Sequence, residues 1–182
     1  MEDYLDFDRQ EDVLSSLEEF CASLERAKHS DRAWKYVMIS AHNALQGCIC
    51  IALRNGNAFQ TWNERHLKKW LEAYRKGDDL PDPKLNFFLE LYDKLFENEG
   101  MLDRGNIEWL NETRNGLVHF NTDSYAIHKP SILDACDEAF QAIMLTPQKS
   151  QGIFFYTEDQ EKDFSKLVSE IRELMKWHRA NA

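Results

Sequence analysis

The side chains best suited to chemistry lie in the stretch Ile107–Phe120, which contains Arg114, Asn115 and His119. An imidazole exchanges a proton near neutral pH, so His119 is suited to act as a general acid or base. The guanidinium of Arg114 is a rigid two-pronged donor that suits an anionic group. These residues form the leading candidate site of the chain.

The same stretch has the periodicity of a helix. Ile107, Leu110, Leu117 and Val118 fall on one face when the chain is wound at about 100° per residue, and Arg114 falls in the middle of that face. A core position there would normally hold Leu or Ile. Because an unpaired buried charge is very costly, Arg114 must be paired, hydrated or used by a ligand.

A polar stripe of Asn111, Asn115 and His119 runs beside the apolar one, at i, i+4 and i+8. Arg114 and His119 are about 140° apart around the helix axis, so they lie on adjoining faces and can reach one pocket. Asn115 lies one turn from His119 and can orient its ring. The plainer alternative is a structural arginine paired with an acid from another helix, plus a helix-end histidine bonded to a carbonyl. Spacing alone favours this alternative.

The segment Arg114-Asn115-Gly116-Leu117-Val118-His119 resembles the Arg-x4-His motif of the HEPN superfamily, including the polar residue that the family often carries after the arginine. The resemblance covers roughly residues 32–145. It implies an all-helical, metal-independent endoribonuclease of the kind often found in toxin–antitoxin or phage-defence systems. His119 would exchange protons, Arg114 would stabilise the charged phosphate, and Asn115 would orient His119 or hold the phosphate.

The resemblance also implies partners. HEPN proteins commonly pair so that two motifs face one cleft, which predicts a homodimer whose interface contains the Arg114 helix. RNA is the expected substrate, and an antitoxin protein is a further candidate partner. No cofactor and no metal are implied.

Two further sets of residues are supporting candidates. His42 and Asn111 can line the same cleft, although His42 is more simply a satisfied histidine at the edge of the core. A basic segment with interleaved aromatic rings can stack and steer RNA, although an amphipathic helix with a solvated basic face is the commoner explanation. Its candidate RNA-binding residues are Arg65, Lys68, Lys69, Trp70, Arg75 and Lys76.

Long segments of 3.6-residue periodicity predict an all-α fold, an antiparallel helical bundle of the HEPN type in a single domain spanning residues 1–182. Phe87 and Val118 are among the side chains expected to face inward. The segment 153–156 is expected to form either a short strand or an extended docking segment. The predicted helices are 8–28, 32–53, 61–76, 84–98, 107–120, 130–145 and 158–179, the first and last of them flanking the HEPN-like core.

Composition and charge limit the classes of protein to which the chain can belong. The net charge of −10 argues against broad nucleic-acid binding, but residues 64–76 hold five bases and two acids. No apolar run approaches the length of a membrane span, and the first residues lack the layout of a signal peptide, so we expect a cytoplasmic protein with no membrane partner. The four cysteines have no metal-binding spacing, so we expect neither a disulfide nor a structural metal.

The sequence therefore predicts a homodimeric HEPN-type endoribonuclease. The alternative is a non-catalytic helical module that binds RNA or a protein, and a third hypothesis is a scaffold domain without a nucleic-acid role.

Overall fold

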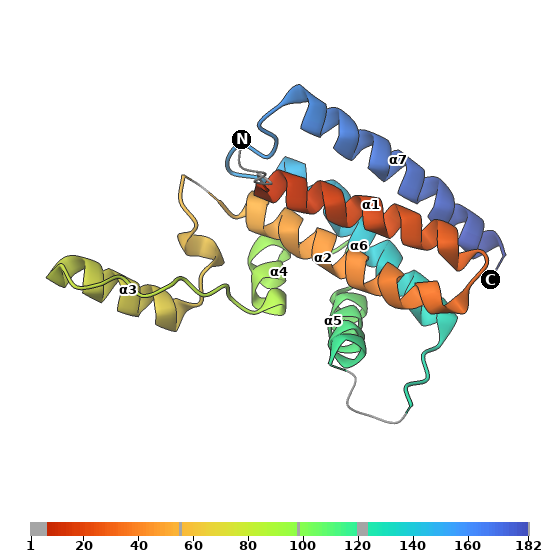
Figure 1. Cartoon of the computed structure of the whole chain (residues 1–182), viewed down its shortest axis with the longest axis horizontal. Coiled ribbons are helices and arrows are strands. Elements are labelled where there is room, and N and C mark those ends of the chain that lie inside the picture. Colours follow the sequence, from red (N-terminus) through yellow and green to blue (C-terminus); the bar gives the residue numbers. More distant parts are fainter. Residues whose placement is uncertain (1–6, 55, 98, 120–123, 182) are drawn as a thin grey trace, which may run out of the picture.

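The computed structural model describes residues 7–54, 56–97, 99–119 and 124–181, and within them the fold is all-α, as predicted (Figure 1). One isolated β-bridge and two short 3-10 helices, η1 (Asp31–Ala33) and η2 (Phe59–Thr61), accompany the α-helices. The helices are α1 (Arg9–Ala27), α2 (Trp34–Ala52), α3 (Glu64–Lys76), α4 (Phe88–Phe96), α5 (Arg104–Val118), α6 (Lys129–Lys149) and α7 (Glu158–Ala180).

Four long helices form the body of the bundle. α1 packs against both α2 and α7, and α2 packs against α6 on its other side (Figure 1). The α1–α2 contact is close because Gly47 lacks a side chain: a Cβ there would lie 2.6 Å from Cγ2 of Val13. α2 is the most central helix, since Val37, Ala41 and Leu45 on it are all fully buried.

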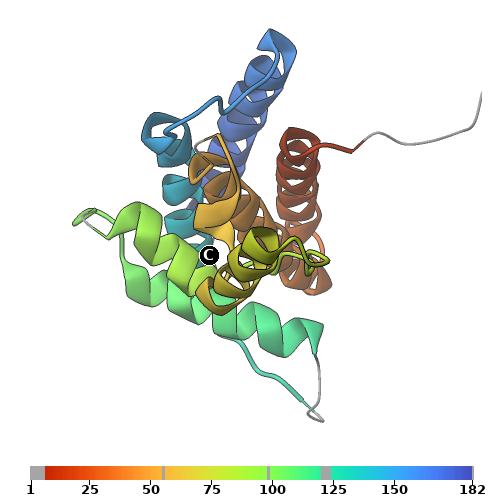
Figure 2. The ribbon, with the colours of Figure 1, turned by 90° about the vertical axis from the view of Figure 1, so that its left-hand side faces the viewer.

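α4 and α5 lie across one side of this body, and both contact α2 (Figure 2). α5 begins at Arg104, earlier than predicted, because the side chain of Asp103 caps it by accepting from the N–H of Gly105 at 2.8 Å. It ends at Val118, and the predicted continuation to Phe120 lies outside the described residues. The prediction that Val118 faces inward is wrong, since it is 44% exposed in the last turn.

Phe87 was also expected to face inward, and this prediction is wrong. The side chain is 71% exposed. Phe87 is the N-cap of α4 and has extended backbone angles, so it precedes the helical face on which Phe88 and Leu91 are buried. Helical periodicity therefore does not apply to it.

α6 continues past its predicted end at Leu145 and includes Pro147. A proline inside a helix leaves the carbonyl four residues earlier without its usual N–H donor. Here the hydroxyl of Thr146 donates to the carbonyl of Ile143 at 2.6 Å and supplies that missing bond. The segment 153–156 that follows is the predicted docking segment and forms no strand: Phe154 is buried against Phe164, and Gln10 donates to its carbonyl.

α3 projects from the bundle as an arm (Figure 1). None of its residues is buried, and it makes no extensive contact with another helix. Asn63 caps it at the start, and Gly77 ends it with a positive φ of 72°. The base of the arm is closed by the bridge between Trp62 and Leu85. Among the described residues, no helix is long and apolar enough to cross a membrane.

Candidate functional site

Arg114 lies where α5 faces α2, and its side chain is partly buried. Its Nη1 donates to Oδ1 of Asn115 at 3.1 Å, and its Nη2 donates to Oδ1 of Asn43 at 3.4 Å. Its Nε–H is buried without an acceptor, and no carboxylate of a described residue forms an ion pair with it. Among the described residues, Arg114 therefore lacks the acid partner of the structural alternative. Two amides orient the guanidinium without neutralising it.

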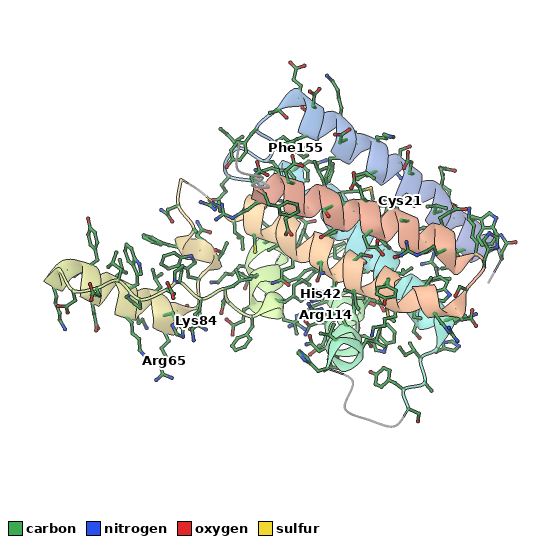
Figure 3. All side chains as sticks on the ribbon, in the orientation of Figure 1. Cys21, His42, Arg65, Lys84, Arg114 and Phe155 are labelled. Carbon is green, nitrogen blue, oxygen red and sulfur yellow. The ribbon has the colours of Figure 1, made fainter. Side chains whose placement is uncertain are left out.

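His42 reaches the same interface from α2 and is only 2% exposed (Figure 3). Its Nε2 donates to Oδ1 of Asn111 at 3.1 Å, its ring packs on Phe88, and its Nδ1 is buried without a partner. Burial lowers the pKa of His42 to about 4; the hydrogen bond with Asn111 opposes this shift, and the charge of Arg114 adds to it. His42 is therefore neutral at pH 7 and cannot supply protons there.

The structure brings Asn111, Arg114 and Asn115 of α5 together with His42 of α2. Asn43, which sequence reasoning missed, completes this group of residues, which we call the amide network. A polar side chain next to His42 in the middle of a largely apolar helix is the signal that could have indicated it.

His119 lies just beyond the end of α5, as its C-cap, and is exposed. Its backbone N–H donates to the carbonyl of Asn115 at 3.0 Å, and its ring forms no hydrogen bond with another described side chain. Its backbone angles (φ −101°, ψ 35°) depart from helical values, so the helical stripe predicted for Asn111, Asn115 and His119 ends before it. His119 lies at the end of the helix that carries Arg114.

Tyr125 also lies close to the candidate site. A Cβ on Gly116 would come within 3.3 Å of the Tyr125 ring, so this ring lies against the last turn of α5. This ring is 44% exposed and can form part of the wall of a substrate site. No periodicity in the sequence places Tyr125 there, because it is outside a helix.

The basic residues predicted to bind RNA lie elsewhere. Arg65 is on the α3 arm, far from Arg114 in the view of Figure 3. Trp70 stacks on Tyr74 with their ring planes 6° apart and also contacts Trp62 and Phe59. The basic side chains of Arg65, Lys68, Lys69, Arg75 and Lys76 belong to a helix with no buried residue.

The cysteines are free thiols in the structure. Burial raises the pKa of Cys48 to about 12 and that of Cys50 to about 11, so neither is a ready nucleophile. Within the described ranges, no three His, Cys, Asp or Glu side chains are grouped to hold a metal ion.

The fold and the site define an all-α bundle in which one helix carries an arginine that no described carboxylate pairs with and ends at an exposed histidine. No family model, curated protein sequence or solved structure matches the chain.

Proposed function

We propose that the protein is a metal-independent endoribonuclease of the HEPN type, acting in toxin–antitoxin regulation or phage defence. The observation that supports this most is the state of Arg114. Its charge is partly buried, held by the amides of Asn43 and Asn115, and opposed by no carboxylate among the described residues. A structural arginine in that position is normally paired, whereas a phosphate-binding arginine must keep its charge available.

The reaction assigns one role to each side chain. The 2′-hydroxyl of the substrate loses its proton and attacks the adjacent phosphorus, and the bond from phosphorus to the 5′-oxygen breaks as that oxygen takes up a proton. The products are a 2′,3′-cyclic phosphate and a 5′-hydroxyl end. Arg114 has five N–H donors, of which the amides occupy two, so one N–H on each terminal nitrogen remains for the phosphate.

His119 is the proton-exchanging group of this proposal. The reaction needs both a base and an acid, and each chain offers one exposed imidazole at this helix end. A homodimer that brings together the two copies of the Arg114 helix would supply both. Val118, which is exposed beside His119, is an apolar contact suited to that interface.

The test is cleavage of total RNA by the purified protein in excess chelator. Arg114→Ala and His119→Ala are each expected to lower the rate by about 10²–10⁴-fold, the usual cost of losing one such group. Because both side chains serve a solvent-facing site, we expect the melting temperature to change little. Arg32→Ala and His128→Ala are matched controls, because each removes the same kind of side chain from an exposed position elsewhere.

Absence of cleavage by the wild-type protein, together with a large fall in melting temperature for Arg114→Ala, would refute the proposal. That result would favour the second candidate, a non-catalytic helical module that binds RNA or a protein. The α3 arm supports this second candidate, because an amphipathic helix with no buried residue is suited to docking.

A further inference from the structure

A cavity of about 500 Å³ lies between α1, α2 and the base of the arm. α1 contributes Arg9 and Asp12, and α2 contributes Asn43. Arg54, just beyond the end of α2, and the ring of Trp62 complete the wall nearest the arm. Figure 3 shows this part of the molecule where the α3 arm leaves the bundle. The amide network includes Asn43, so the cavity adjoins the candidate site.

The cavity is cationic. Neither the Arg9 nor the Arg54 side chain forms a hydrogen bond or ion pair with another described residue, and Nη1 of Arg54 is buried without an acceptor. Asp12 is the one carboxylate on the wall, so two guanidinium groups face one acid. A buried N–H without an acceptor is costly, and an anionic ligand would relieve that cost.

The position of the cavity relative to Arg114 indicates which anion fits. Asn43 accepts a hydrogen bond from Arg114 and lines the cavity, and Arg54 lines it just beyond the end of α2 at Ala52. At 1.5 Å per residue the helix between Asn43 and Ala52 is about 14 Å long. A few nucleotides of extended strand cover this distance.

We propose that the cavity is a subsite for single-stranded RNA next to the cleavage site. Arg9 and Arg54 bind a backbone phosphate a few nucleotides from the one held by Arg114. Trp62, which is partly buried and contacts Phe59 and Trp70, offers a ring on which a neighbouring base can stack. This inference rests on the proposed function, since Arg114 marks where the strand is cut.

The experiment measures binding without cleavage. A labelled 2′-O-methyl RNA hexamer, which lacks the attacking hydroxyl, is titrated with the full-length protein by fluorescence anisotropy at several salt concentrations. The double variant Arg9→Gln, Arg54→Gln is expected to bind at least tenfold more weakly. Its salt slope is expected to fall by about 0.7, because the two arginines share one phosphate and each phosphate contact to a single strand contributes about that much.

Control variants and competitors test whether the weaker binding is specific to the cavity arginines. Arg32→Gln removes an exposed arginine at the opposite end of α2 and is expected to bind like the wild type. If Arg54→Gln fails to fold, the affinity of Arg9→Gln alone tests the subsite, because Arg9 is exposed and its replacement should not disturb the fold. Inorganic phosphate and adenosine monophosphate serve as competitors. Displacement of the hexamer by either at micromolar concentration would assign the cavity to a free nucleotide or phosphate and overturn the strand subsite.

The two proposals fail in distinguishable ways. If the wild type cleaves RNA and the double variant binds and cleaves equally well, the subsite is wrong and the nuclease stands. If the wild type binds the hexamer through Arg9 and Arg54 but cleaves nothing, the catalytic proposal is wrong and the cavity remains an RNA-binding site. A wild-type protein that does not bind the hexamer overturns the subsite outright.

Discussion

Replacement of His42 by Gln should remove one specific part of the acid sensitivity of this fold. The folded protein holds His42 neutral, with a pKa of about 4, whereas the ordinary value for histidine is 6.5. Between pH 6.5 and 4 the unfolded chain therefore carries a proton on this residue that the folded chain does not. The stabilisation from neutral His42 is complete above pH 6.5 and is lost as the pH falls towards 4.

The size of the effect follows from this pH window. Stability changes by about 1.4 kcal/mol per pH unit when one proton separates the two states. From pH 6.5 to pH 4 the free energy of unfolding falls by about 3 kcal/mol, and from pH 7 to pH 5 it falls by about 2 kcal/mol. This is a large fraction of the total for a domain whose unfolding free energy is typically about 5–15 kcal/mol.

The assay is urea unfolding of wild type, His42→Gln and His128→Gln at pH 7 and pH 5. His42→Gln lowers stability at pH 7, because the contacts with Asn111 and Phe88 change, so the comparison uses the loss between the two pH values. Wild type and the exposed control His128→Gln should lose about 2 kcal/mol more than His42→Gln. Equal losses in all three proteins would refute the argument that burial of His42 excludes its proton.

Two further predictions concern assembly and the arm. Light scattering at micromolar concentration should give a dimer, and Val118→Glu should convert it to a monomer, whereas the same change at exposed Tyr36 should not; a monomeric wild type would exclude the shared cleft. Lys68→Glu combined with Lys69→Glu should weaken RNA binding several-fold without changing the melting temperature, because α3 buries no residue. An unchanged affinity would leave the basic face of the arm as ordinary solvated surface.

The helices that build the core were predictable because their burial is periodic. α1 and α7 each lie within one or two residues of their predicted ranges, since apolar residues repeat along one face of each. The errors fall at positions where the periodicity does not apply. Phe87 precedes its helix, and Val118 is in a last turn that no other helix covers. The end of α6 was missed because the Thr146 hydroxyl compensates for Pro147.

The candidate site was predictable only along its own helix. Arg114, Asn115 and Asn111 lie near one another in sequence, and helical geometry is enough to relate them. Asn43 belongs to α2, so its contact with Arg114 depends on tertiary packing that no spacing within the sequence encodes. The same holds for Arg9, on α1, and Arg54, which follows α2, since both line one cavity although they are far apart in sequence.

The exposed arm was predicted as a helix but not as a projection. Its apolar face holds Leu67, Trp70, Leu71 and Tyr74, a pattern that normally indicates packing on a core. In the structure Trp70 packs on the rings of Phe59 and Trp62 at the base of the arm and on Tyr74, which is 66% exposed. Leu67 and Leu71 are only partly buried. An amphipathic pattern shows that a helix has an apolar face. It does not show whether that face packs on the core of the same chain or on a partner.

Polar side chains on α2 give the two proposals a common physical basis. α2 is the central helix of the bundle, and apolar side chains at every position facing a neighbour would stabilise it best. Instead, His42 and Asn43 face the Arg114 helix, and Arg54, just beyond the end of α2, lines the cavity. Arg114 and Arg54 both keep a buried N–H without an acceptor. Such groups lower the stability of the bundle by themselves, so their retention is best explained by a ligand that accepts from them. A phosphodiester strand reaching from Arg114 to Arg54 would satisfy both.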